Sequence, residues 1–109
     1  MHELSITRSI VAICSEQAKG APVRRVTVEI GKLSAVLPES VRFCFDVCTQ
    51  GTLLDGATLE IIETAGLGRC KDCGADVALA ELVGRCGCGS RNLALVRGDE
   101  LSIREMEVA

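Results

Sequence analysis

The 109 residues include no tryptophan, no tyrosine and only two phenylalanines, so aromatic residues make up 2% of the chain. Its core must therefore be aliphatic, and apolar residues, at 48%, are abundant enough to build one. Functions that stack nucleobases on aromatic rings, such as binding of single-stranded nucleic acid, are disfavoured. The net charge of −3 gives no general attraction to phosphate backbones or anionic membranes. We therefore expect neither nucleic acid nor a membrane as a partner.

Long apolar runs are also missing. No stretch approaches the roughly 20 apolar residues of a membrane span. The opening MHELSITRSIVAIC carries Glu3 and Arg8 and lacks the basic start and apolar run of a signal peptide. We expect a cytoplasmic protein, in which disulfides are disfavoured. The seven cysteines are then expected to be metal ligands or buried thiols.

Helical spacing of apolar residues marks two segments. Between Leu4 and Lys19 the apolar side chains fall on one face, and Gly20 follows as a helix stop. The second segment opens at Pro38, a residue suited to the first turn of a helix, and Gly51 marks its end. We predict one helix over residues 4–19 and another that begins at Pro38.

Three further stretches are predicted strands: VRRVTVEI and ELSIREMEV by alternation, and ATLEIIET by its β-branched residues. Between the last two, residues 66–98 are rich in cysteine and glycine and too poor in apolar residues to fold on a core of their own. We predict an α+β fold, with a small antiparallel or mixed three-stranded sheet, two helices and an inserted zinc-ribbon-like module. The body would comprise residues 1–65 and 99–109, and the module residues 66–98.

Four cysteines form two close pairs. Cys70 and Cys73 make a CxxC motif, and Cys86 and Cys88 make a CxC motif after twelve intervening residues. Four thiolates from two turns can close the tetrahedron of a structural zinc site, and metal binding would supply folding energy that the module lacks. A rubredoxin-type iron site and a metal-free redox dithiol are the alternatives, because sulfur ligands alone do not separate zinc from iron.

The other three cysteines lie on the apolar faces of the expected helices. Cys14 belongs to the first helix, and Cys44 and Cys48 belong to the second. A free cysteine in such a place usually packs as a small hydrophobic residue. We therefore predict packing roles for all three, with a functional thiol as the alternative.

The only histidine is residue 2, beside the amino terminus. The amine of Met1, the amide nitrogen of His2 and its imidazole can bind one metal ion in fused chelate rings. Three nitrogens in a plane suit Ni(II) or Cu(II), and Glu3 can complete the coordination through its backbone nitrogen or its carboxylate. The amine and the amide must lose protons, so binding is expected to weaken as pH falls.

Four motifs make the chain similar to a known family. They are MHELSI at the start, VTVEIGKLSAVLPESVRFCFD in the middle, the cysteine pairs that begin with CKDC, and GDELSIREMEV near the end. In this order they span nearly the whole chain, and together they resemble the HypA/HybF nickel metallochaperones of hydrogenase maturation. The resemblance implies a nickel-binding α/β body, a separate zinc module, and a carrier rather than an enzyme.

The resemblance also implies ligands and partners. Met1, His2 and Glu3 would bind Ni(II), the cargo, and the four paired cysteines would hold a structural Zn(II). The family delivers nickel to the large-subunit precursor of [NiFe] hydrogenase, and in some bacteria to urease, together with a nickel-pathway GTPase. Two positions depart from the family pattern: the second cysteine pair is CxC where CxxC is usual, and Leu37 stands where some relatives have an acidic residue nearby. Glu39 is close to it in sequence.

Two other classes of function are alternatives. Residues 66–98 carry five basic and three acidic side chains, which would suit a zinc-ribbon module that binds a protein or a nucleic acid. An iron-containing electron carrier of the rubredoxin type is the second alternative. No catalytic constellation is recognisable, so no enzyme is expected. The sequence leaves open which enzyme is served and whether the chain is a monomer or a homodimer.

Overall fold

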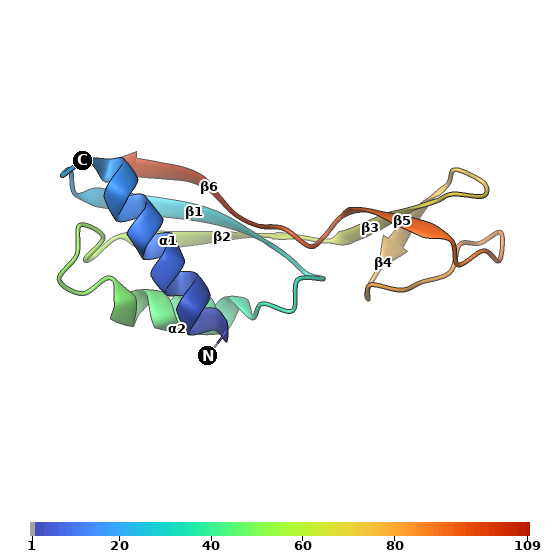
Figure 1. The fold of residues 1–109 in the computed structure, drawn as a ribbon, viewed down its shortest axis with the longest axis horizontal. Coiled ribbons are helices and arrows are strands. Elements are labelled where there is room, and N and C mark those ends of the chain that lie inside the picture. The colour runs from blue at the N-terminus through green and yellow to red at the C-terminus, as the bar shows by residue number, and fades with distance from the viewer. Residues whose placement is uncertain (1) are drawn as a thin grey trace. The chain divides into compact units, whose positions relative to one another are not determined.

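The structure is a computed structural model that describes residues 2–109. Within these residues two helices and six strands follow in the order α1 His2–Ala18, β1 Val23–Gly31, α2 Pro38–Cys48, β2 Thr58–Thr64, β3 Gly66–Cys70, β4 Asp76–Leu79, β5 Leu93–Arg97 and β6 Leu101–Val108 (Figure 1). No helix of residues 2–109 has both the length and the hydropathy needed to cross a membrane.

The chain folds as two compact units. The first combines the stretch that ends at Glu29 with Val36–Ile62 and Ser102–Ala109. The second combines Ile30–Ala35 with Glu63–Leu101. The first unit holds both helices, and β3, β4 and β5 belong to the second.

Helix α1 begins two residues earlier than the sequence predicts. It starts at His2 rather than Leu4, so His2 and Glu3 lie in its first turn instead of forming an arm. A carboxylate at this position is favoured by the helix dipole, and the Thr7 hydroxyl donates to the Glu3 carbonyl at 2.7 Å. The helix ends at Ala18, and Gly20, at φ 88°, is the predicted stop.

The core of the first unit lies between the helices and the sheet. Helix α2 begins at Pro38, as predicted, and buries Val41, Cys44 and Phe45. From β1, Val26 and Val28 are fully buried. Phe45 is the largest of the fully buried side chains, and aliphatic residues make up most of the remainder, as the scarcity of aromatic residues predicts.

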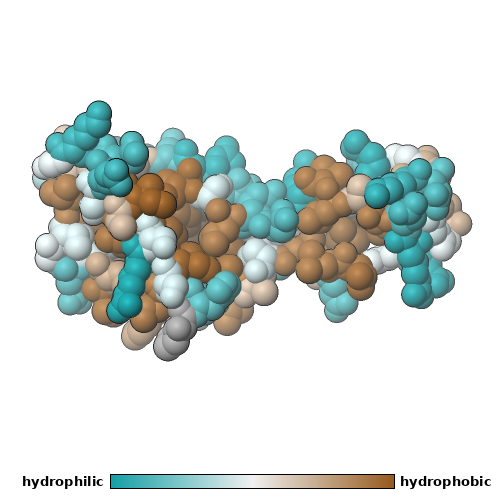
Figure 2. Space-filling view, viewed as in Figure 1, coloured by the Kyte–Doolittle hydropathy of each residue, from teal (hydrophilic) through white to brown (hydrophobic). Residues whose placement is uncertain are grey.

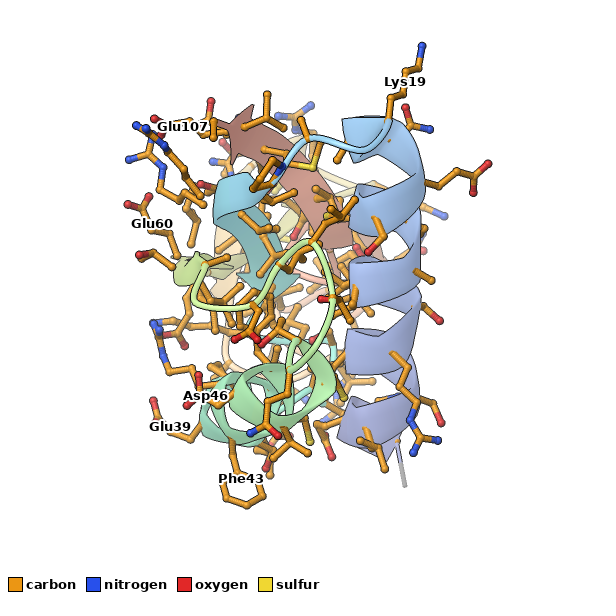
Figure 3. All side chains as sticks on the ribbon, turned by 90° about the vertical axis from the view of Figure 1, so that its left-hand side faces the viewer. Lys19, Glu39, Phe43, Asp46, Glu60 and Glu107 are labelled. Carbon is orange, nitrogen blue, oxygen red and sulfur yellow. The ribbon has the colours of Figure 1, made fainter. Side chains whose placement is uncertain are left out.

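The sheet of the first unit has the strand order β2-β1-β6, so the last strand returns to the body as predicted. Ala109 N–H donates to the Pro22 carbonyl, and Glu107 pairs with Arg25, which sets β6 antiparallel to β1. Arg25 also pairs with Glu60 of β2 at 3.4 Å. Figure 3 shows Glu60 and Glu107 on the side of the sheet away from α1, which leaves the apolar side of β1 to the helices.

The second unit is built on a three-stranded antiparallel sheet of order β4-β3-β5. The buried hydrophobic residues of this unit are few: Leu79, Cys70 and Cys86 in Glu63–Leu101, and Ile30 and Leu33 in its other segment. In Figure 2 polar side chains gather over the loop end of this unit, and apolar side chains lie over its strands. This small core, together with the helices and sheet of the first unit, confirms the predicted α+β class with a cysteine module.

Two glycines let the loop Ile30–Ala35 pack within the second unit. Leu33 N–H donates to the Gly98 carbonyl at 2.7 Å, and its side chain lies against Gly66. A Cβ on Gly66 would meet the Leu33 Cδ1 at 2.6 Å, and Gly98 has φ 120°. Larger residues at either position would therefore displace this loop.

Candidate metal centres

The four paired cysteines come together in the second unit. Cys70 ends β3 and Cys73 lies in the turn that follows it, whereas Cys86 and Cys88 lie in the loop between β4 and β5. The four Sγ atoms lie within 4.8 Å of one another. Between the two loops, Cys70 Sγ is 3.7 Å from Cys88 Sγ, and Cys73 Sγ is 3.5 Å from Cys86 Sγ.

These sulfur positions fit a tetrahedral metal site. Zinc–sulfur bonds of about 2.3 Å in a regular tetrahedron separate the sulfur atoms by about 3.8 Å, close to both measured distances. Four protein ligands leave no coordination position for a substrate, as in structural zinc sites. The cluster therefore fits a closed zinc site, and the same donors would fit iron.

The two cysteine pairs are formed by turns of different length. Gly74 N–H donates to the Cys70 carbonyl in the first turn, and Gly89 N–H donates to the Cys86 carbonyl in the second, each at 2.9 Å. Both glycines have positive φ, 80° and 92°, which glycine adopts without steric cost. The second turn is one residue shorter, so the CxC motif tightens its loop while its sulfurs still reach the cluster.

The close sulfurs shift one another's acidity. Hydrogen bonding from the Cys73 N–H, the largest effect, and from the Asp72 N–H lowers the pKa of the Cys70 thiol to about 6. At Cys73 the Ala75 N–H lowers the pKa, but the three neighbouring cysteine side chains outweigh it and raise the pKa to about 12. Because the four thiols lie close together, their ionisation to four thiolates is unfavourable. A bound cation would neutralise the thiolate charges and make full ionisation favourable.

The amino-terminal candidates lie in the first turn of α1. His2 Nδ1 is 3.4 Å from Glu3 Oε2, and the same oxygen accepts a hydrogen bond from Leu37 N–H at 3.4 Å. The Leu37 N–H is the main reason that the pKa of Glu3 is lowered. The His2 side chain is 62% exposed and that of Glu3 is 18% exposed. Met1, the third predicted ligand, lies outside the described residues.

The start of the helix leaves backbone nitrogens without acceptors inside the helix. The first four N–H groups of an α-helix have no acceptor within the helix, and those of His2 and Glu3 are among them. The helix dipole favours negative charge at this end, which suits both the Glu3 carboxylate and a deprotonated amide. The imidazole is accessible, and the carboxylate is held against the protein.

An open cavity of about 270 Å³ adjoins Glu3. The other residues that line it are Glu39, Ser40, Phe43 and Cys44. Glu39 is therefore near the amino-terminal residues in space as well as in sequence, and its carboxylate is 3.6 Å from Arg42 Nε. Phe43 points away from α2 into solvent and is 72% exposed (Figure 3).

The remaining cysteines lie in the helices of the first unit. Cys14 and Cys44 are buried, as a packing role predicts, and Cys48 is only half-buried. Burial raises the pKa of the Cys14 thiol. A raised pKa keeps a thiol protonated and poorly reactive, which agrees with packing rather than with chemistry at Cys14.

Comparison with known proteins gives matches along almost the whole chain. Residues 1–108 match the family model described as hydrogenase/urease nickel incorporation, metallochaperone, HypA. The hydrogenase maturation factor HypA of Nostoc punctiforme is 59% identical over 108 residues, which cover 99% of this chain and 96% of that protein. The protein of the same description from Rippkaea orientalis is 60% identical over 109 residues, with the same coverage.

Solved structures show the same fold. The solution structure of the nickel metallochaperone HypA from Helicobacter pylori matches with a TM-score of 0.68 and 30% identity, covering 97% of this chain and 96% of that one. A second solution structure, of a HypA protein, matches with a TM-score of 0.72 and 31% identity, covering 100% of this chain and 97% of that one. The similarity therefore extends over both units.

Proposed function

Because this chain belongs to the HypA family of nickel metallochaperones for hydrogenase maturation, we propose that it binds Ni(II) at its amino terminus and delivers it to the precursor of the hydrogenase large subunit. Proteins of this family are maturation factors, so the chain is a carrier rather than an enzyme. The nickel ligands would be the Met1 amine, the His2 amide and imidazole, and Glu3. We propose the cytoplasm as the place of delivery.

The contact of Glu3 with both His2 and Leu37 is the observation that supports this site best. One carboxylate oxygen is 3.4 Å from His2 Nδ1 and 3.4 Å from the Leu37 nitrogen. A carboxylate fixed in this way would hold the imidazole beside the helix start, where the His2 amide has no helical acceptor. Nitrogen donors in a plane are the set that Ni(II) prefers.

The second proposed metal is a structural Zn(II) held by Cys70, Cys73, Cys86 and Cys88. Zinc there would contribute the folding energy that a module with so small a core lacks. In this assignment residues 1–65 and 99–109 form the nickel-binding body, and residues 66–98 form the zinc-binding module. Zinc would remain in place while nickel comes and goes.

Release follows from the small number of nickel ligands. Three nitrogens and a neighbouring carboxylate at an exposed helix start leave room for a donor from another protein, so nickel can leave by ligand exchange. We propose a nickel-pathway GTPase as the partner in this step and the hydrogenase precursor as the acceptor. Urease is a second client that the family description allows.

Metal analysis of protein without an amino-terminal tag tests this function. We expect one zinc per chain as purified and one further Ni(II) per chain on titration, because the two sites use different donors. Zinc and nickel are counted by mass spectrometry of the desalted protein. Iron in place of zinc, with a red colour, would instead identify a rubredoxin-type electron carrier.

Glu3→Gln is predicted to weaken Ni(II) binding by about 10-fold or more, because a neutral amide attracts a cation less than the carboxylate that it replaces. The amide keeps the size of the side chain and removes its charge. Glu16→Gln, the same change at an exposed position of α1, is the control and is expected to leave affinity unchanged. Calorimetric titration of both variants checks this, and equal affinities would remove the Glu3 carboxylate from the site.

A further inference from the structure

Apart from the sulfur atoms, one pair of side chains joins the two cysteine loops. Asp72 lies between Cys70 and Cys73 in the first loop, and Ser90 lies two residues after Cys88 in the second. The Ser90 hydroxyl donates a hydrogen bond to Asp72 Oδ2. We call this pair the clasp.

Ser90 is also bonded within its own loop. Its hydroxyl oxygen accepts a hydrogen bond from Asn92 N–H at 3.0 Å, and its carbonyl accepts one from Cys86 N–H at 2.8 Å. Lys71 N–H in turn donates to the Asn92 carbonyl at 2.9 Å. Ser90 therefore links the turn that holds one cysteine pair to one of the two residues that separate the other pair.

We propose that the clasp determines the metal selectivity of the four-cysteine cluster by keeping its two loops in the relative orientation that a tetrahedral ion requires. This proposal rests on the proposed function, in which the same chain carries Ni(II). A nickel carrier that has four thiolates of its own must keep its cargo out of them. Selectivity between divalent metals comes from geometry and ligand type rather than from raw affinity alone.

Geometry supplies the discrimination. A tetrahedron keeps all six sulfur–sulfur distances equal, whereas a square plane lengthens two of them and shortens the other four. With two sulfurs on each loop, that change requires one loop to rotate against the other. The clasp joins the two loops, so it resists the rotation that leads to the planar arrangement that Ni(II) favours.

The clasp is suited to local control rather than to overall stability. Asp72 is exposed and Ser90 is half-buried. At an exposed carboxylate a hydrogen bond competes with water, so its net contribution to folding is modest, but it can fix the orientation of groups beside a metal. Loss of the clasp is therefore expected to change metal exchange and leave the fold of the zinc-bound protein intact.

The test uses full-length, zinc-loaded protein that carries His2→Ala, so that nickel uptake reports only the cysteine cluster. Excess Ni(II) is added, released zinc is measured with a chromophoric chelator, and thiolate-to-nickel charge-transfer absorption is recorded. With the clasp intact, zinc stays bound and this absorption does not develop. With Asp72→Ala or Ser90→Ala we expect zinc release about 10-fold faster, with nickel taking its place.

The module offers a matched control. Asp76→Ala makes the same substitution nearby, but Asp76 pairs with Arg69 at 3.1 Å and not with Ser90. It is expected to release zinc as slowly as the parent, and Ser90→Thr, which keeps the hydroxyl, is expected to do the same. The Asp72→Ala, Ser90→Ala double variant should release zinc no faster than Ser90→Ala alone, because loss of the hydroxyl already breaks the bond to Asp72.

Two results would overturn the clasp: unchanged zinc release in both single variants, or an equal increase with Asp76→Ala, which would make local charge the cause. Circular dichroism of the zinc-bound variants separates either result from unfolding. Failure of the proposed function is visible separately, as absent nickel binding in protein that retains His2. The experiments can therefore disprove the role of the clasp without disproving the amino-terminal nickel site, and they can disprove the nickel site without disproving the role of the clasp.

Discussion

His2→Ala should abolish stoichiometric Ni(II) binding while zinc content and fold remain unchanged. The substitution removes one of three nitrogen donors, so the loss of affinity should exceed the roughly 10- to 100-fold that loss of an outer partner costs. The side chain is 62% exposed, and its one described polar contact is with Glu3. Its removal therefore leaves no cavity and no buried polar group unpaired.

Calorimetric nickel titration of untagged protein measures this effect, with zinc counted in the same sample. Ser5→Ala is a suitable control, since Ser5 is exposed in the same helix. In cells, the His2→Ala protein should fail to restore hydrogenase activity to a strain that lacks the maturation factor, unless nickel is supplied in excess. Wild-type nickel affinity in His2→Ala protein would show that the imidazole is not a ligand.

Removal of zinc should unfold the second unit and spare the first. The second unit buries few hydrophobic residues, namely Leu79, two cysteines, Ile30 and Leu33, whereas the first unit buries Phe45, Leu54 and a row of valines. Zinc binding in small modules contributes about 10–16 kcal/mol at pH 7, more than such a core can replace. We expect β3, β4 and β5 to lose hydrogen-exchange protection by about 100-fold or more, since 1.4 kcal/mol corresponds to a factor of ten.

Hydrogen exchange followed by mass spectrometry resolves the two units in one experiment. Cys73→Ser should reproduce the effect of a chelator, because it leaves three sulfur ligands. Cys48→Ser, at a half-buried position in the first unit, is the control and should leave the module protected. Persistent protection of β3–β5 after zinc removal would mean that the module folds on its own contacts.

Much of the fold is predictable because its signals are local. Alternation of apolar residues predicts β1, since Val26 and Val28 face the helices and Arg25 faces the other side of the sheet. Gly20 predicts the end of α1 because few other residues adopt φ 88° without strain. The cysteine cluster is predictable for the same reason: a pair of ligands within three residues almost fixes their separation.

Contacts between groups that are far apart in the sequence are not predictable from it. The Leu37 N–H that donates to Glu3 lies 34 residues further along the chain. Every residue except proline has a backbone N–H, so the residue type does not reveal this donor. The apolar periodicity predicts a start at Leu4, because the polar residues His2 and Glu3 add nothing to that pattern, whereas α1 begins at His2. The sequence does not predict the packing of Leu33 against Gly66 either, because a glycine permits close approach but does not identify the residue that approaches.

Nickel titration of protein acetylated only at its α-amine tests the amino-terminal site most directly. Acetylation removes one donor and leaves His2, Glu3 and the cysteine cluster as they are. The proposed coordination predicts that Ni(II) affinity falls to the level of His2→Ala, with one zinc per chain retained. Undiminished nickel uptake by the acetylated protein would contradict it and place the nickel ligands elsewhere.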